Sequence, residues 1–189
     1  MSFSIHDWPL DYLSRLDTRP LATIELLVVH CTELPDLATA REYAERVLYP
    51  SGTGNSGHYY VDRDGSLYRF VPDEHIAHHV QGKNQHSIGI ELVNRGRWPN
   101  WHDSRHQSMD EAYPATQIES LLALIGNLRD TLPGLRHIAG HQDLDTREIP
   151  ASDDPQHRIR RKLDPGPLFP WPAVLEVCGL SRLGLKGAA

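Results

Sequence analysis

Cysteine is nearly absent from this chain of 189 residues, because only Cys31 and Cys178 occur. This scarcity excludes a disulfide framework as the main source of stability. No apolar run approaches the roughly 20 residues that cross a bilayer. Residues 1–20 carry acids, a tryptophan and prolines instead of a cationic start followed by an apolar run. We therefore expect neither a membrane span nor a signal peptide. A cytoplasmic protein fits these absences, and so does one released by another route.

The chain also lacks an excess of basic residues. It has 19 Lys and Arg against 25 Asp and Glu, a net charge of −6, which disfavours a protein that binds nucleic acid. Its 39% hydrophobic and 23% charged residues are ordinary for a globular protein. The length suits one domain with a sizeable core. We predict a single domain over residues 1–189, with a core at about 22–175 and terminal extensions at 1–21 and 176–189; oligomeric state stays open.

Hydrophobic patterns predict strands that alternate with helices. Buried strands are expected at 22–31 and 87–94, a hairpin at 58–71 with its turn at Asp64-Gly65, and a short strand at 135–141. A helix is expected over 36–48, with Thr39 and Glu42 as a capping box and Val47 and Leu48 on its apolar face; another follows Pro114, capped by Thr116 and Glu119. Residues 95–114 and 144–161 are expected to be long polar connections. This order predicts an α/β fold with a mixed central β-sheet flanked by helices.

Three side chains that bind metals well fall at the ends of these elements. His30 ends one apolar strand, His141 ends another, and Asp164 lies in the proline-rich loop "RKLDPGPLFPW". Ligand sites in open α/β sheets lie beyond the carboxyl ends of the strands, and two imidazoles with one carboxylate form a catalytic zinc set. Spacing alone favours the simpler alternative, in which two strand-end histidines are satisfied by hydrogen bonds. A generic histidine-rich metal binder fits less well, because most of the twelve histidines are scattered.

Five segments carry a resemblance to a known family. The segments "LLVVHCTE", "GHYYVDRDGSLYRFV", "NQHSIGIELVN", "IAGHQDLD" and "RKLDPGPLFPW" occur in this order. Together they resemble the zinc N-acetylmuramoyl-L-alanine amidases of the AmpD type, which share a fold with peptidoglycan recognition proteins and phage amidase-lysozymes. The resemblance covers most of residues 22–175. It implies one Zn²⁺ per chain and a muropeptide or peptidoglycan substrate.

The resemblance also implies roles for single residues. His30, His141 and Asp164 match the zinc ligands, and Glu91 and Lys162 match the two catalytic residues. Three further side chains match polar positions near the cleft and are expected to contact substrate, with buried hydrogen bonding as the alternative: His58, His78 and Asn84.

The chemistry assigned to Glu91 and Lys162 follows from their surroundings. Glu91 lies in an apolar strand, where Gly89 and Val93 offer no counter-charge, so burial should raise its pKa and suit proton transfer from water. Lys162 would stabilise the oxyanion formed on the amide carbonyl. The alternatives are a solvated edge-strand carboxylate for Glu91 and a surface ion pair of Lys162 with Asp164, which is usually worth little.

The sequence departs from the wider fold in three places, one of which is the block before "SIGIEL", shortened here to "IAHHVQGKNQHS". Gly57 stands where phage and recognition-protein relatives place a tyrosine. The connection 142–161 is longer than in compact relatives, and we expect it to border the cleft. Its Asp143, Asp145, Asp154 and His157 are alternative ligands, although a solvated loop is favoured. Trp98 and Trp101 could stack on a sugar or anchor their loop, and Cys31 should face the core because it alternates with His30.

Two functions remain compatible with the sequence. The favoured one is a zinc amidase that cleaves between N-acetylmuramic acid and L-alanine, since all five expected metal and catalytic residues are present. The other is a recognition module that binds muropeptides without cutting them. The absence of an export signal points to a cytoplasmic recycling enzyme acting on 1,6-anhydromuropeptides, and a lytic amidase acting on the polymer stays open.

Overall fold

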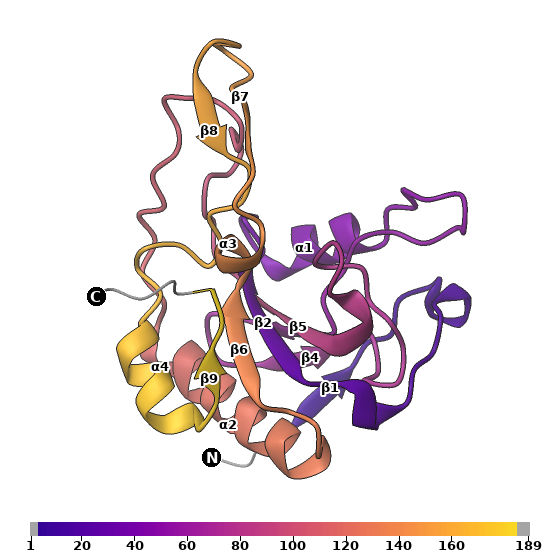
Figure 1. Cartoon of the computed structure of the whole chain (residues 1–189). Helices are drawn as coiled ribbons and strands as arrows, with labels where there is room; N and C mark the ends of the chain where they lie inside the picture. Colours follow the sequence, from indigo (N-terminus) through magenta and orange to yellow (C-terminus); the bar gives the residue numbers. More distant parts are fainter. Residues whose placement is uncertain (1–3, 185–189) are drawn as a thin grey trace.

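The computed structural model describes residues 4–184 and contains a seven-stranded sheet in the order β1-β4-β3-β5-β2-β6-β9 (Figure 1). Neighbouring strands are parallel except for the antiparallel hairpin of β3 and β4. The predicted mixed α/β sheet flanked by helices is confirmed. The strands of this sheet are β1 (Ile5–Asp7), β2 (Leu26–Cys31), β3 (Tyr59–Val61), β4 (Leu67–Arg69), β5 (Ser87–Leu92), β6 (His137–Gly140) and β9 (Ser181–Arg182).

The two faces of the sheet have different neighbours. Helices α2 (Ala115–Thr131) and α4 (Trp171–Cys178) pack on one face, where Leu27 and Val29 of β2 join a fully buried core with Leu121 and Leu124 of α2. Helix α1 (Leu37–Ala44) lies over the opposite face. Side chains alternate along a strand, so His30 and Glu91 point away from α2. The strand pattern therefore sends two chemically active groups to the same side.

Both predicted helices exist, but their predicted capping boxes are wrong. Helix α1 begins after Asp36, whose carboxylate accepts the Thr39 N–H at 2.7 Å. It ends at Ala44, so Val47 and Leu48 lie outside it and are exposed. In α2 the N-cap position is Pro114, and the Thr116 hydroxyl instead donates to the Arg63 carbonyl.

The described parts of the predicted terminal extensions contribute to the sheet. β1 pairs in parallel with β4, and β9 pairs in parallel with β6. Helix α4 crosses the predicted start of the C-terminal extension at residue 176 and packs on α2. These segments are therefore edges of the fold, and that the whole chain forms one domain stays a prediction.

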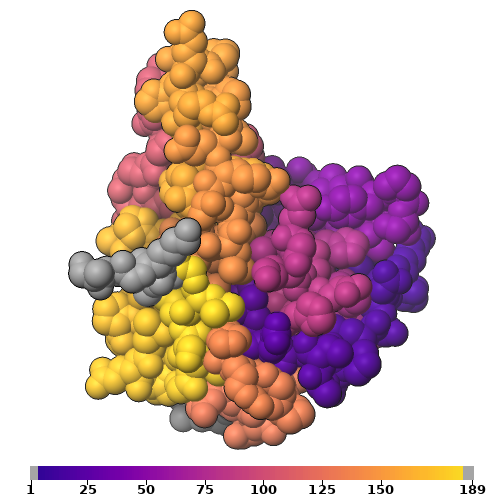
Figure 2. Space-filling model, in the orientation of Figure 1, coloured from indigo at the N-terminus to yellow at the C-terminus, as the bar shows by residue number. Residues whose placement is uncertain are grey.

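A narrow arm projects from the body beside the carboxyl ends of the central strands (Figures 1 and 2). Residues 144–161, expected to be an irregular connection, contain the antiparallel hairpin of β7 (Glu148–Pro150) and β8 (Arg158–Arg160). The predicted long excursion after β5 runs beside this hairpin, where the Ser152 N–H donates to the His102 carbonyl at 2.7 Å. Among the described residues, no helix is long and apolar enough to cross a bilayer.

Candidate metal centre and active-site cleft

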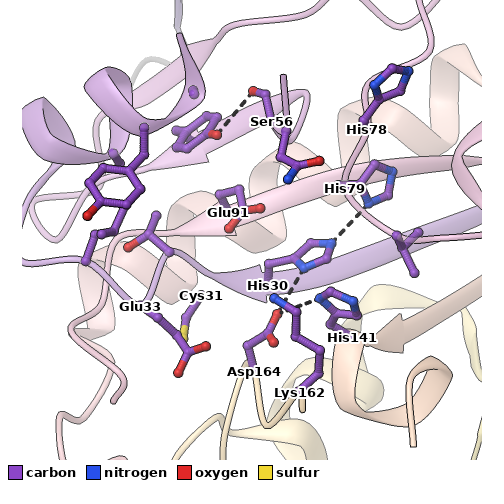
Figure 3. Close-up of a pocket in the computed structure, with 18 of the residues that line it drawn as sticks. His30, Cys31, Glu33, Ser56, His78, His79, Glu91, His141, Lys162 and Asp164 are labelled. Carbon is purple, nitrogen blue, oxygen red and sulfur yellow. Dashed lines mark hydrogen bonds and ion pairs between the residues drawn. The ribbon is translucent and has the colours of Figure 1, made fainter. Parts of the chain in front are cut away.

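Three buried side chains converge at the carboxyl ends of β2 and β6. His30 is the second-last residue of β2, His141 follows β6 as the first residue of the short helix α3 (His141–Leu144), and Asp164 comes from the loop after the arm. Asp164 Oδ2 lies 3.0 Å from His30 Nδ1 and 3.2 Å from His141 Nδ1 (Figure 3). One donor atom from each residue falls within 4.8 Å of the others. The structure thus brings together the three residues expected to bind metal.

The donor atoms of the three side chains are arranged to bind a cation. Asp164 Oδ1 is buried and has no hydrogen-bond partner among the described residues. Ligand atoms of a tetrahedral Zn²⁺ site, each about 2.0–2.2 Å from the metal, lie about 3.3–3.6 Å apart, close to the separations seen here. Burial lowers the pKa of His30 to about 4, against the opposing negative charge of Asp164, so the imidazole is neutral at pH 7 and able to bind metal. The triad therefore fits a zinc ion.

Asp164 remains a carboxylate in this buried position. Burial by itself would raise its pKa, but electrostatic attraction to His141 and Lys162 and the hydrogen bond with His141 hold the pKa of Asp164 well below its usual range. A buried anion of this kind is stable only with a compensating charge or a metal. The triad therefore offers one carboxylate and two imidazoles to a dication.

Close packing fixes the loop that carries Asp164. The Asp164 carbonyl accepts the Gln142 N–H at 2.9 Å, and the Tyr113 hydroxyl donates to the Pro165 carbonyl at 2.6 Å. Gly140 permits this approach, because a Cβ there would lie 2.8 Å from Pro165 Cδ. Residues on both sides of the triad therefore hold the carboxylate, although the loop has neither helix nor strand geometry.

Glu91 stands next to the triad on the same face of the sheet. In the parallel pair of β2 and β5, Glu91 is the register partner of His30, and neighbouring strands lie about 4.8 Å apart. Figure 3 shows Glu91 on one side of His30, with Asp164 and Lys162 on the other. Burial raises the pKa of Glu91 to about 8, with Asp164 adding to the shift and Lys162 opposing it. A carboxyl group with this pKa can exchange protons near neutral pH.

Lys162 brings a positive charge to the same cleft. Its side chain forms no hydrogen bond or ion pair with any residue of the described range 4–184. The backbone just before Lys162 is fixed by Arg97, which lies in the excursion after β5. The Arg97 guanidinium donates to the carbonyls of Arg160 and Arg161 at 3.2 and 3.3 Å. Arg97 is itself held by a buried two-point ion pair with Glu33. The ammonium is thus positioned by its backbone and left available to a ligand.

A cleft of about 870 Å³ contains the triad, Glu91 and Lys162. Its walls extend from His79 and Asn84 on one side to Tyr43 and Tyr49 near α1 on the other. A smaller pocket of about 270 Å³ adjoins it and shares Arg161 and Lys162. The predicted connection 142–161 meets the cleft through Arg161, at its C-terminal end. The volume of the cleft and its polar side chains suit a ligand of several linked groups.

The three residues expected to contact substrate differ in position. His58 is fully buried outside the cleft lining; its Nδ1 accepts the Gly89 N–H at 3.0 Å and its Nε2 lies 2.9 Å from Arg19. This geometry supports the buried alternative and corrects the expectation of substrate contact. His78 lines the cleft and packs edge-on against Tyr49.

Asn84 also lines the cleft, but its side chain has a local task. Its Oδ1 accepts the N–H groups of His79 and Val80 at 3.1 and 2.8 Å. The amide oxygen is therefore occupied by the loop, and only the amide nitrogen is left for a ligand. Substrate contact by His78 and Asn84 stays a prediction.

The other acids of the connection between His141 and Asp164 have partners of their own. Asp143 accepts two hydrogen bonds from Arg182, and Asp145 pairs with Arg147 and Arg161. Asp154 caps its own turn at Gln156. None of these belongs to the three-residue metal group found in the described chain.

Trp98 and Trp101 act as anchors of their loop. Their rings pack edge-on at 5.2 Å, and both lie 6.2 Å from the Tyr43 ring. The Trp101 indole N–H donates to the Glu33 carbonyl at 2.9 Å. Trp101 also lines the smaller pocket, so one edge of the anchor borders the binding region.

Sequence reasoning missed His79 and Glu33. His79 Nδ1 lies 3.0 Å from His30 Nε2, on the side of the ring away from Asp164. Its only sequence signal is the cluster "HIAHH", in which His78 was the residue expected to contact substrate. Glu33 fixes Arg97 across 64 positions of chain, a pairing that no local pattern reveals.

Gly57 leaves room for Glu91, which leads to a prediction. A Cβ on Gly57 would lie 2.7 Å from Glu91 Cγ and 3.1 Å from the Gly89 carbonyl oxygen. Gly57→Ala should displace Glu91 and lower kcat/KM by about 10²-fold, the cost typical of a small misplacement, with zinc content unchanged. Gly126→Ala is the matched control, because a Cβ there meets nothing within 4 Å. Equal activity of the two variants would show that Glu91 does not depend on this space.

Comparison with known proteins decides the family. The family model described as N-acetylmuramoyl-L-alanine amidase matches residues 20–167. The chain belongs to this family. The five segments that resembled AmpD-type amidases thus have the relationship they suggested, and the matched range includes both histidines and the aspartate of the triad.

Individual relatives of the amidase family support this assignment. N-acetylmuramoyl-L-alanine amidase AmiD of Escherichia coli K12 is 28% identical over 181 residues, which cover 83% of this chain and 56% of AmiD. The 1,6-anhydro-N-acetylmuramyl-L-alanine amidase AmpD of the same organism is 31% identical over 125 residues, covering 61% of this chain and 54% of AmpD. The chain spans about half the length of the curated relatives it matches.

Solved structures share the amidase fold. E. coli AmiD, in a complex with the substrate anhydro-N-acetylmuramic acid-L-Ala-D-gamma-Glu-L-Lys, superposes with a TM-score of 0.62 at 25% identity, over 84% of this chain and 58% of that one. The amidase LysC from Clostridium intestinale URNW gives a TM-score of 0.67 over 94% of this chain and 98% of that one. At 19% identity, LysC supports the fold alone.

Proposed function

We propose that this chain is a zinc-dependent N-acetylmuramoyl-L-alanine amidase. It would hydrolyse the amide bond between the lactyl group of N-acetylmuramic acid and L-alanine in muropeptides or peptidoglycan. The observation that carries the proposal is the position of Glu91, a carboxyl group of raised pKa beside His30 of the metal triad. The family match and the names of AmiD and AmpD support the same reaction.

Five residues of the cleft have tasks in this reaction. His30, His141 and Asp164 would hold one Zn²⁺ per chain. When bound, zinc supplies Lewis acidity toward the amide carbonyl and lowers the pKa of water. Glu91 accepts the proton of the attacking water and later returns it to the leaving amine nitrogen. Lys162 donates a hydrogen bond to the carbonyl oxygen as negative charge develops there.

Glu91 and Lys162 are both suited to the successive steps of this reaction. Glu91 must be ionised to accept a proton, and its raised pKa then makes the protonated form a ready donor. Lys162 has no partner in the described structure to lose before it contacts the carbonyl oxygen. Little reorganisation is therefore needed between the free cleft and the transition state.

A digest with two substrates tests the proposal. Zinc-loaded protein is incubated with anhydro-N-acetylmuramyl tripeptide or with intact sacculi, and the products are read by mass spectrometry. We expect a free stem peptide that begins with L-alanine, loss of this product in a chelator, and its return with added Zn²⁺. Binding of the soluble muropeptide by calorimetry without any release of peptide, from fully zinc-loaded protein, would make the recognition module correct instead.

The same digest addresses the substrate preference. Faster release from the soluble compound supports a recycling role, and faster release from sacculi supports a lytic one. The cytoplasmic location expected from the sequence stays a prediction that immunoblotting of cell fractions would test.

Shortening the hairpin between Pro150 and Arg158 should change the ratio of activity on sacculi to activity on the soluble muropeptide if the arm contacts the polymer. A constant ratio would mean that the arm is only a connector.

A further inference from the structure

His79 links the metal triad to the interior through three successive hydrogen bonds. Its Nδ1 lies 3.0 Å from His30 Nε2, and its Nε2 lies 3.2 Å from the Ser87 hydroxyl. The Ser87 hydroxyl in turn lies 2.9 Å from the Lys83 carbonyl oxygen. The His30 and His79 rings meet edge to face, with centroids 5.2 Å apart. Figure 3 shows His79 on the side of His30 opposite Asp164.

The last member of this chain of contacts sets the direction of the others. A carbonyl oxygen only accepts, so Ser87 donates its single hydroxyl hydrogen to Lys83. The Ser87 oxygen is then an acceptor, and His79 donates from Nε2. A neutral imidazole carries one N–H, which leaves His79 Nδ1 as an acceptor for the Nε2–H of His30.

This direction has a consequence at the triad. With its hydrogen on Nε2, a neutral His30 presents a bare Nδ1 toward Asp164 Oδ2, at 3.0 Å. Two lone pairs at this distance repel unless a cation lies between them. The contacts from His79 to Lys83 therefore leave His30 Nδ1 without a hydrogen, so that its lone pair can bind a metal ion.

The Asn84 side chain and the backbone of β5 hold His79 in this place. The His79 N–H donates to Asn84 Oδ1 at 3.1 Å. On β5, Gly89 lets the ring lie against the strand, because a Cβ there would come within 2.6 Å of His79 Cγ and 2.7 Å of Nδ1. The ring therefore rests on bare backbone at Gly89, and the amide of Asn84 holds its loop.

We propose that His79 is a positioning residue for the metal site: by accepting the Nε2 hydrogen of His30, it keeps Nδ1 as the metal-binding atom, and Ser87 keeps His79 in the tautomer that accepts. The inference rests on the proposed metal triad. It does not depend on which bond the protein cleaves, so metal binding tests it apart from amidase activity.

The test measures Zn²⁺ affinity of metal-free variants by competition with a chromophoric chelator. His79→Ala should weaken Zn²⁺ binding by about 10- to 100-fold, the usual effect of removing a partner behind a metal-binding histidine. His79→Asn should recover most of the loss, because its side-chain oxygen can stand where Nδ1 stands and only needs to accept. His86→Ala is the control, since that exposed histidine bonds to the Thr23 carbonyl and not to His30.

Two results would overturn the inference. One is wild-type affinity in a folded His79→Ala protein. The other is an equal loss in the Ala and Asn variants, which would mean that the ring only fills space. If His79→Ala does not fold without metal, Ser87→Ala decides, because it keeps the ring and removes the group that fixes its tautomer: a severalfold weaker affinity supports the inference, and unchanged affinity contradicts it. The d–d spectrum of the Co²⁺ form, shifted in His79→Ala and restored in His79→Asn, provides an independent readout.

Discussion

Asp164→Ala should remove nearly all bound zinc and, with it, nearly all hydrolysis. The variant loses one of three protein ligands, and a zinc site with three protein donors tolerates this poorly. It also loses the only carboxylate that, in the described chain, faces both His30 and His141. Elemental analysis after dialysis should give close to one zinc per wild-type chain and only a trace in the variant.

Thermal melting separates metal loss from misfolding in this variant. A ligand that binds only the folded state stabilises it by about 2.7 kcal/mol at 100 times its Kd, so zinc should raise the Tm of the wild type and leave Asp164→Ala unchanged. Each protein is also melted without metal, so that the loss of the contacts between Asp164 and the two imidazoles is measured apart from the loss of zinc. Asp154→Ala, an exposed acid of the arm, is the control. Full zinc content in Asp164→Ala would contradict the ligand assignment.

The sequence predicts the frame of the site well because strands have a period of two. His30 and Cys31 alternate in β2, and the structure buries Cys31 on the face opposite His30 as expected. The register of β5 against β2, which places Glu91 beside His30, follows from the parallel pairing and cannot be deduced from either strand alone. Only the family resemblance joined these residues before the structure did.

The wrong expectations have local physical causes. The pattern Thr-x-x-Glu that suggested capping boxes also occurs inside a first turn, and Asp36, three positions before Thr39, is the residue whose carboxylate reaches an unpaired N–H. His58 was expected to contact substrate because the family resemblance matches it to a polar strand position near the cleft. Its ring is instead held by Arg19, from a segment that the sequence suggested was peripheral.

The hairpin of the arm could not be predicted from the sequence because its strands are short. β7 and β8 have three residues each, with Pro150 at the end of one, so no hydrophobic period marks them in the sequence. Their position depends on distant partners, such as Arg97, which joins Glu33 after β2 to the backbone before Lys162. The lysine proposed to stabilise the oxyanion is thereby placed by contacts from two other parts of the chain.

Glu91→Gln should lower kcat by about 10²–10⁴-fold, the usual contribution of a positioned acid–base group, with zinc content unchanged. Glutamine keeps the shape of the side chain but cannot accept a proton from water. Lys162→Ala is the comparison variant: it should lose about 10²–10³-fold through the missing oxyanion donor and keep the pH dependence that belongs to Glu91. A near wild-type rate in Glu91→Gln would mean that the general base lies elsewhere.

The pH dependence of Glu91 gives a second, independent measurement. Activity should rise as Glu91 ionises, at a pH below about 8 once a dication lies nearby, and this acidic limb should be absent in Glu91→Gln. In metal-free protein the folded-state pKa of about 8 exceeds the ordinary value of 4.5. The stability that Glu91 contributes is therefore fully present below pH 4.5 and is lost as the pH rises toward 8. Glutamine does not titrate, so metal-free wild type should lose Tm relative to Glu91→Gln over this range. Parallel Tm curves would instead mean that Glu91 is a solvated carboxylate with an ordinary pKa.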